Sequence, residues 1–135
     1  MPNEFIQPPE LFASEKLGFT QVVTAAPGKL VFVSGQTALD AGFQVIGGDD
    51  LTAQAEQALC NLGHALGAAG AQPSDLTSLR IYIAGFGPES MKAIGRPLAR
   101  FFDGAPPCAQ TLLGVQTLAM PELKIEVEAT AVVSG

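Results

Sequence analysis

The 135-residue chain is poor in basic residues and has no long apolar run. Seven lysines and arginines stand against thirteen aspartates and glutamates, which gives a formal net charge of −6 at pH 7. The diffuse field of such a chain repels phosphate backbones and anionic membranes, so nucleic acid is not expected as a partner. No uninterrupted apolar run approaches the ~18 residues that a membrane helix needs, so no membrane partner is expected either.

Cysteine and histidine are equally scarce, because Cys60, Cys108 and His64 are the whole supply. A structural zinc site needs four such ligands at short spacing, so no metal site is expected. The N-terminus carries Glu4, Glu10 and two consecutive prolines but no signal-peptide pattern. We therefore expect a cytoplasmic protein without disulfides. Cys108, at the start of a predicted strand, is expected to be a buried thiol, with a reactive thiol as the alternative.

Hydrophobic residues make up 47% of the chain, enough for the core of one domain. Residues 1–17 are rich in proline and aperiodic, which predicts an N-terminal arm. Residues 18–135 are then the single domain.

Apolar periodicity within the domain predicts two helices and several strands. The first helix follows an Asp50 N-cap, runs over 51–69 and ends at Gly70. The second runs over 91–102, and Pro97 inside it predicts a kink or two short pieces. The predicted strands are 19–25, 30–36, a short 43–46, 79–84, 108–118 and 123–133, the first two joined as a hairpin by a Pro27-Gly28 turn.

This order of elements favours an α+β fold, in which the two helices pack on one face of a mixed sheet of five to six strands. The strand over 30–36 is apolar on both sides, since Val31 and Val33 point one way and Leu30 and Phe32 the other. The second face of the sheet must be covered as well. The sequence therefore predicts a homo-oligomer whose sheets pack against each other.

Two segments offer chemistry. Glu126 and Glu128 lie two residues apart in the last strand, so both carboxylates project to one face. One of them is a candidate general base, and a solvated strand face is the alternative. Ser34 and Gly35, at the end of an apolar strand, offer a hydroxyl and a closely approached backbone to a ligand, or they simply end the strand.

Several segments, taken in chain order, resemble the RidA family (YjgF-type, reactive intermediate deaminase). They are Gly18-Phe19-Thr20-Gln21, the strand 31–36 with its Ser-Gly-Gln end, the helix 59–70, Phe101-Phe102, and the ending 124–133 with its Ile-Glu-Val-Glu-Ala run. The resemblance covers about residues 18 to 133. It implies a chorismate-mutase-like fold and a homotrimer with small-molecule clefts at the subunit interfaces.

Active members of that family hydrolyse enamines and imines such as 2-aminoacrylate, releasing ammonia and a 2-keto acid without a metal or cofactor. Carried over by position, the glutamate that handles the attacking water is Glu126, and the residues of the strand end are Ser34 and Gly35. The arginine that binds the substrate carboxylate falls on Gln110. Glutamine offers one neutral amide in place of a charged, bidentate fork.

Three further positions depart from the family in the same direction. Phe19 stands where many members have tyrosine, Leu112 where cysteine is common, and Gly95 where asparagine is common. Each change removes a polar group. The resemblance therefore implies a cleft that is more apolar than in the deaminases and that takes an uncharged or bulkier ligand.

These observations leave three functions open. The first is a hydrolase of an enamine, imine or related small molecule, with Glu126 placing the water and Gln110 and Ser34 holding the ligand. The second is a non-catalytic, metabolite-binding or regulatory trimer. The third, a ribonuclease, is disfavoured by the net charge. Arg96 and Arg100 on the second helix are the alternative source of a positive charge in the cleft.

Overall fold

The computed structural model describes residues 3–134 of the chain. This range contains two α-helices, two 3-10 turns and six strands. In chain order they are β1 (Glu4–Ile6), η1 (Glu15–Leu17), β2 (Val22–Thr24), β3 (Gly28–Gln36), α1 (Leu51–Ala68), η2 (Pro73–Asp75), β4 (Leu76–Ala84), α2 (Ser90–Phe102), β5 (Ala109–Val115) and β6 (Ile125–Ser134).

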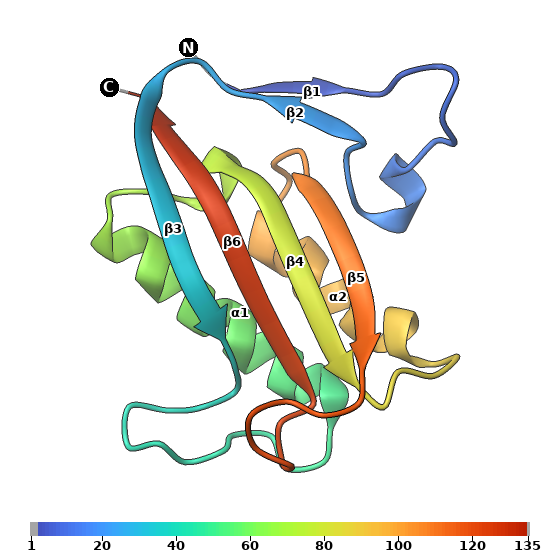
Figure 1. Cartoon of the computed structure of the whole chain (residues 1–135), viewed down its shortest axis with the longest axis vertical. Helices are drawn as coiled ribbons and strands as arrows, with labels where there is room; N and C mark the ends of the chain where they lie inside the picture. The colour runs from blue at the N-terminus through green and yellow to red at the C-terminus, as the bar shows by residue number, and fades with distance from the viewer. Residues whose placement is uncertain (1–2, 135) are drawn as a thin grey trace.

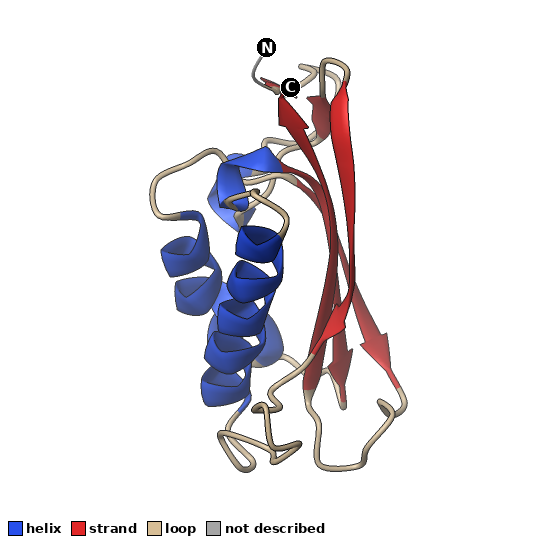
Figure 2. Cartoon of the chain, turned by 90° about the vertical axis from the view of Figure 1, so that its left-hand side faces the viewer, coloured by secondary structure: helices blue, strands red, loops and turns tan. Residues whose placement is uncertain are grey.

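The main sheet has four strands in the order β3-β6-β4-β5. Strands β4 and β5 run parallel, and the other neighbours are antiparallel. Both helices lie on one face of this sheet, and the other face is left uncovered (Figures 1 and 2). The predicted α+β architecture, with two helices on one face of a mixed sheet, is confirmed. The predicted number of five to six strands in that sheet is wrong, because the main sheet has four. The remaining two strands, β1 and β2, form a separate antiparallel pair.

The predicted hairpin between residues 19–25 and 30–36 is wrong, because β2 pairs with β1. Gly28 is the first residue of β3 and takes no turn conformation. A Cβ at this position would lie 2.3 Å from the carbonyl oxygen of Val133 in β6. The glycine that suggests a turn in the sequence therefore serves the close approach of two paired strands.

The predicted short strand over 43–46 is a turn with one isolated bridge, between Leu39 and Val45. The Asp40 carboxylate accepts hydrogen bonds from the backbone N–H groups of Gly42 and Gln44, each at 2.9 Å. An aspartate that bonds its own downstream backbone favours a turn over an extended ladder. Phe43 accordingly has a φ of 66°.

Helix α1 begins and ends as its sequence predicts. The Asp50 carboxylate accepts from the backbone N–H groups of Thr52 and Ala53, at 2.9 and 3.3 Å. At the other end Gly70 takes a φ of 76°, and the N–H of Ala71 donates to the carbonyl oxygen of Leu66 at 2.9 Å. The apolar stripe of the helix is buried against the sheet.

A fully buried glutamine interrupts that stripe. Gln54 donates from Nε2 to the carbonyl oxygens of Gly48 and Glu122, at 2.7 and 2.9 Å, and its Oε1 accepts from the N–H of Lys124 at 2.8 Å. Buried amides are tolerated when every polar atom finds a partner. The side chain thereby ties the loop before α1 to the loop before β6, and so fixes where β6 starts.

Helix α2 is continuous through Pro97, so the predicted division into two pieces is wrong. Proline has no N–H, which deprives the carbonyl oxygen four residues earlier, that of Ala93, of its helical partner. The hydroxyl of Thr52 on α1 donates to this oxygen at 2.8 Å. A side chain of the neighbouring helix thus satisfies the carbonyl that proline leaves unpaired.

The predicted burial of Cys108 is confirmed, since the residue is 1% exposed. Burial raises the pKa of the Cys108 thiol from 9.0 to about 12. A thiol that stays protonated at neutral pH is a poor nucleophile, which argues against the reactive alternative.

The bond between Thr52 and the helix carbonyl yields a stability prediction. Replacing Thr52 with valine leaves the Ala93 carbonyl unpaired, and we expect the free energy of unfolding to fall by about 1–2 kcal/mol. Urea unfolding at fixed protein concentration measures the change. In a Pro97→Ala background the new N–H bonds that carbonyl, so the same Thr52→Val change should cost less than half as much. Equal costs in the two backgrounds would contradict this role of the hydroxyl.

Candidate functional site

The segment between η1 and β2 covers the start of strand β5. Gly18 has a φ of 89° and turns the chain out of η1. Two residues later the backbone N–H of Thr20 donates to the carbonyl oxygen of Cys108 at 3.1 Å. The side chain of Gln110 adds a second tie, because its Nε2 donates to the carbonyl oxygen of Gly18 at 3.0 Å. The chain before β2 therefore forms one wall of the space between β5 and α2.

A pocket of about 180 Å³ lies there, between α2, the start of β5 and this segment. It brings together Phe19, Gly95, Gln110 and Leu112, which the sequence predicts as binding residues from four distant places in the chain. We call it the inner pocket. Its complete lining is Leu17, Phe19, Ile81, Met91, Ile94, Gly95, Leu98, Gln110 and Leu112. No charged side chain is among them.

The polar group of the inner pocket is the Gln110 amide. A carbonyl oxygen only accepts, so the atom facing Gly18 is the NH₂ group and the orientation of the amide is determined. Its Oε1 atom has no hydrogen bond within residues 3–134. At the position where the resemblance implies an arginine, the inner pocket is thus lined by an uncharged amide, with Oε1 as an acceptor and one remaining N–H.

The other predicted site residues meet at a different place, the end of β3. The ladder between β3 and β6 is irregular between Val33 and Gln36, which leaves Ser34 and Gly35 in a bulge. The Glu126 carboxylate lies over this bulge, since a Cβ on Gly35 would be 1.8 Å from its Oε2 atom. Ser34 is exposed beside it.

These two groups of residues lie on opposite faces of the sheet. Gln110 pairs with Leu79, which pairs with Ala129, and this set faces the helices. Glu126 pairs with Tyr82 and projects from the uncovered face. The register separates Gln110 and Glu126 by roughly 10 Å along the strands and roughly 10 Å across them. A single chain does not bring the amide and the carboxylate into one pocket.

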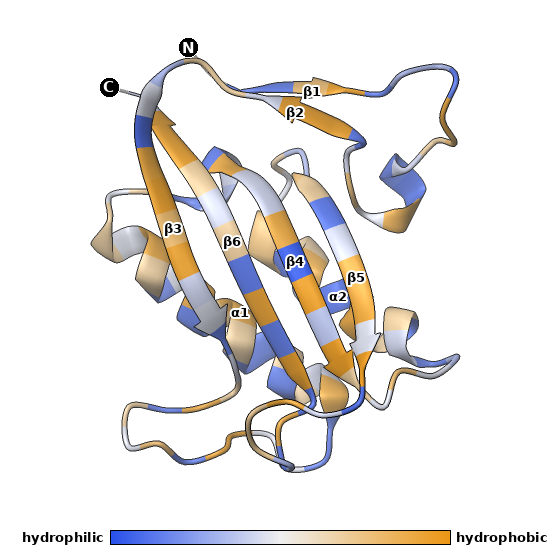
Figure 3. Cartoon of the chain, in the orientation of Figure 1, coloured by the Kyte–Doolittle hydropathy of each residue, from blue (hydrophilic) through white to orange (hydrophobic). Residues whose placement is uncertain are grey.

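The uncovered face is apolar along β3 and polar along its centre. Phe32 is 75% exposed and Leu30 59% exposed, which is unusual for large side chains in a sheet. Beside them Tyr82 donates a hydrogen bond to Glu128, and this bond raises the pKa of Tyr82. Figure 3 shows orange along the middle of β3 and blue bands on its neighbour β6 and on β4, the next strand. The predicted common face for Glu126 and Glu128 is confirmed by their register.

Neither arginine of α2 lines the inner pocket. Arg100 donates from Nη1 to the Glu56 carboxylate on α1 at 3.2 Å, in an exposed ion pair on the outer side of the two helices. Arg96 is exposed and is absent from the lining residues. The inner pocket thus receives no positive charge from α2 within the chain.

Sequence reasoning missed five residues that line the inner pocket: Leu17, Ile81, Met91, Ile94 and Leu98. The apolar stripe of α2 does contain Met91, Ile94 and Leu98, but periodicity does not separate a core contact from a pocket wall. Residues 3–134 hold no group of three or more His, Cys, Asp or Glu side chains that could hold a metal ion. In the same range no helix has the length and apolarity to cross a membrane.

The fold and the two groups of predicted site residues are typical of one class of protein: a small α+β chain of the Rid type. A family model described as Endoribonuclease L-PSP matches residues 13–133, nearly the whole chain. The chain therefore belongs to this family, the L-PSP or Rid family, and the resemblance stated from the sequence is confirmed.

Individual relatives agree with this assignment. Protein DfrA of Myxococcus xanthus is 34% identical over 115 residues, which are 84% of each chain. The crystal structure of YyfB from Yersinia pestis, described as a Rid-family protein of unknown function, is 40% identical, with a TM-score of 0.94 over 98% of this chain and all of that one. The structure of E. coli TdcF with bound serine is 26% identical, with a TM-score of 0.70 over 82% of this chain and 85% of that one.

The contact between Gly35 and Glu126 generates a structural prediction. In Gly35→Ala the new methyl group occupies the position of the carboxylate, so Glu126 must rotate away. Because a flexible side chain absorbs the clash, we expect the free energy of unfolding to change by less than about 1 kcal/mol. A crystal structure of the variant should show Glu126 in another rotamer. An unmoved glutamate beside a shifted bulge backbone would contradict the prediction.

Proposed function

We propose that the protein is a RidA-like, small-molecule-binding homotrimer that hydrolyses an enamine, an imine or a related metabolite, with an altered substrate because Gln110 replaces the carboxylate-binding arginine. The observation that supports this most is the division of the predicted site. Four of its residues surround the inner pocket, and the other three gather on the opposite face of the sheet. The two halves complement each other chemically but belong to different surfaces.

A second copy of the chain is the means of joining them. The uncovered face carries Phe32 and Leu30 in exposed positions, and burying them against another subunit is favourable. In the proposed trimer one subunit supplies the inner pocket and its neighbour supplies Ser34, Gly35 and Glu126. Each cleft then holds an apolar pocket, a neutral amide and a carboxylate.

These groups are sufficient for hydrolysis. Glu126 accepts a proton from water as the water oxygen forms a bond to the imine carbon. The carbon–nitrogen bond then breaks, nitrogen leaves as ammonia, and a carbonyl compound remains. Water supplies the oxygen and two hydrogens, so atoms and electrons balance without a redox partner.

Gln110 argues for a substrate that differs from the 2-imino acids. A carboxylate buried in the inner pocket would find one neutral amide and apolar walls but no positive charge, and an unpaired buried charge is strongly disfavoured. The serine in the TdcF structure shows a relative holding an amino acid-sized molecule. A molecule of similar size but without the negative charge fits this chain better.

The same glutamine supports the second candidate function, a non-catalytic trimer that binds a metabolite for regulation. A protein that keeps the pocket but no longer hydrolyses 2-imino acids has no need of the arginine that binds their carboxylate. Ligands that raise the melting temperature without being consumed would favour this alternative.

The hydrolase proposal predicts a gain of function. With 2-iminopropionate generated in situ, wild type should release ammonia slowly, and Gln110→Arg should raise kcat/KM by at least about tenfold through a charge-assisted contact. Adding Glu126→Gln to that variant should reduce the rate by about 10²–10⁴. Glu128→Gln, two residues along the same face, is the matched control. No ammonia from Gln110→Arg at any concentration would reject hydrolysis of this substrate.

Mixing two proteins that are each weakly active or inactive tests whether the cleft lies between subunits. Wild type lacks the arginine, and the double variant Gln110→Arg/Glu126→Gln lacks the carboxylate. When the two are refolded together, about a quarter of the clefts combine the arginine of one chain with Glu126 of its neighbour. We therefore expect ammonia release from 2-iminopropionate to rise toward a quarter of the Gln110→Arg rate. No rise after confirmed subunit exchange would place both groups in one chain.

A further inference from the structure

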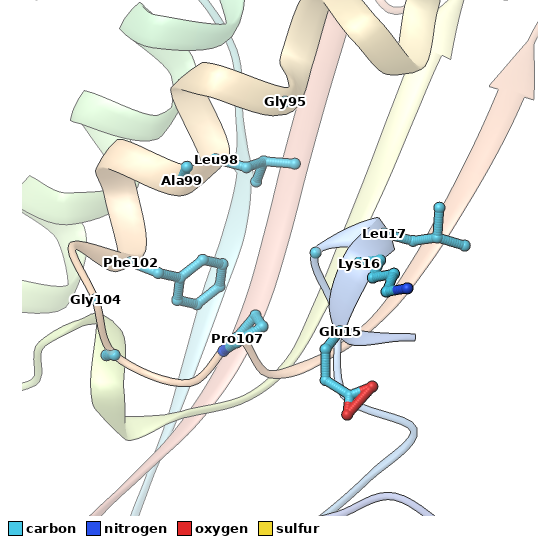
Figure 4. Close-up of a pocket in the computed structure, with 11 residues that line it drawn as sticks. Glu15, Lys16, Leu17, Gly95, Leu98, Ala99, Phe102, Gly104 and Pro107 are labelled. Carbon is cyan, nitrogen blue, oxygen red and sulfur yellow. The ribbon is translucent and has the colours of Figure 1, made fainter. Parts of the chain in front are cut away.

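The inner pocket continues into a second, larger space. This outer pocket has a volume of about 410 Å³ and lies between η1, the second half of α2 and the loop before β5 (Figure 4). Leu17, Gly95 and Leu98 line both pockets, so the two adjoin at these residues. Small-molecule sites usually measure about 300–1,000 Å³. The inner pocket alone is below that range, and the two together are within it.

The walls of the outer pocket are mostly apolar. Phe102 and Leu98 of α2 point toward η1, and Pro107 closes the space at one end (Figure 4). Glu15 and Lys16 also belong to the lining, but their charged ends point away from Phe102 and Leu98 in the same view. Their opposite charges leave this rim without net charge. An apolar group of a ligand would be desolvated here at little electrostatic cost.

Gly95 keeps the two pockets connected. It lies within α2, where glycine costs about 1 kcal/mol relative to alanine, and its φ is not in the left-handed region. No heavy atom lies within 4 Å of the place where a Cβ would be. Neither the backbone conformation nor close packing in the chain therefore requires glycine. A larger side chain at this position would stand in the opening between the two pockets.

The inner pocket selects the head of the ligand by the atom that Gln110 leaves available. One of the two N–H groups of Nε2 is engaged by Gly18, so the amide offers the ligand an acceptor, Oε1, and one remaining N–H. An uncharged N–H group satisfies the Oε1 acceptor, whereas a carboxylate finds at most one neutral N–H and no positive charge in the lining. The head that fits is therefore a neutral imine or enamine N–H.

We propose that the two pockets form one site for a neutral imine or enamine with an apolar substituent about the size of a phenyl ring. The N–H of the ligand donates to Gln110 Oε1, and its substituent passes Gly95 into the outer pocket beside Phe102 and Pro107. Hydrolysis of such a molecule adds the oxygen of water to the imine carbon and releases ammonia and an aldehyde or ketone. This assignment of substrate class rests on the proposed function.

Stable amides test the site without turnover, because a primary amide presents N–H groups and carries no charge. By titration calorimetry, wild type should bind 3-phenylpropanamide at least about tenfold more tightly than propanamide, which lacks the ring, and than 3-phenylpropanoate, which carries a charge. Gly95→Leu, at the opening, and Ala99→Leu, in the outer pocket alone, should each weaken 3-phenylpropanamide binding by at least about tenfold. Lys92→Leu, on α2 outside both pockets, should change it by less than about twofold.

Equal affinity for the three compounds, tighter binding of 3-phenylpropanoate, or undiminished binding by both pocket variants would overturn the inference. Unchanged melting temperatures without ligand verify that the variants fold. Ammonia release by Gln110→Arg reports separately on the proposed function. Hydrolysis of 2-iminopropionate combined with unselective amide binding would uphold that function and reject the substrate class. Selective amide binding without hydrolysis of any imine would uphold the ligand class and reject the reaction.

Discussion

The alternation of side chains along β6 is the constraint on which the rest of the structure depends. Ile125, Val127 and Ala129 enter the core beneath the helices, so the residues between them must project from the other face. Glu126 is one of these residues. The same alternation in β5, read through the register with β4, turns Gln110 toward the helices. Burial of the core thus assigns the two groups to opposite surfaces, and no rotamer change in one chain reverses that assignment.

Two polar side chains of α1 determine where β6 and α2 lie within this arrangement. Gln54 bonds the loop that leads into β6, and the Thr52 hydroxyl bonds the α2 carbonyl that Pro97 leaves unpaired. Both side chains come from the first turn of α1, which Asp50 caps. One helix start therefore positions the strand that carries Glu126 and the helix that carries Gly95. The two proposed half-sites are held by rigid elements, as a precise cleft requires.

Periodicity in the sequence predicts the α+β class, the capped first helix and the buried Cys108, because it indicates which side chains face the core. The family resemblance predicts that Phe19, Gly95, Gln110 and Leu112 belong to one binding site. The sequence does not predict the pairing of β2 with β1 or the turn at Asp40. A glycine such as Gly28 serves either a turn or the close approach of two strands, and an aspartate such as Asp40 precedes either a turn or a strand. Composition alone does not distinguish these cases. The outer pocket was also missed, since its walls come from the predicted N-terminal arm, the second helix and the loop before β5, which the sequence does not show to be neighbours.

Gly28, Gly35 and Gly95 illustrate why these ambiguities are resolved only in three dimensions. At Gly28 and Gly35 a Cβ would collide with Val133 and Glu126, so glycine is required by close approach. At Gly95 the space is open, and the absence of a side chain has no packing explanation within the chain. Gly95 lies at the junction of two pockets, and neither the backbone nor the core requires a glycine there. The substituent of the proposed ligand, which passes between the pockets, accounts for it. Gln110 acts in the same direction, since an amide at the position where the resemblance implies an arginine lowers the polarity of the pocket that Gly95 opens.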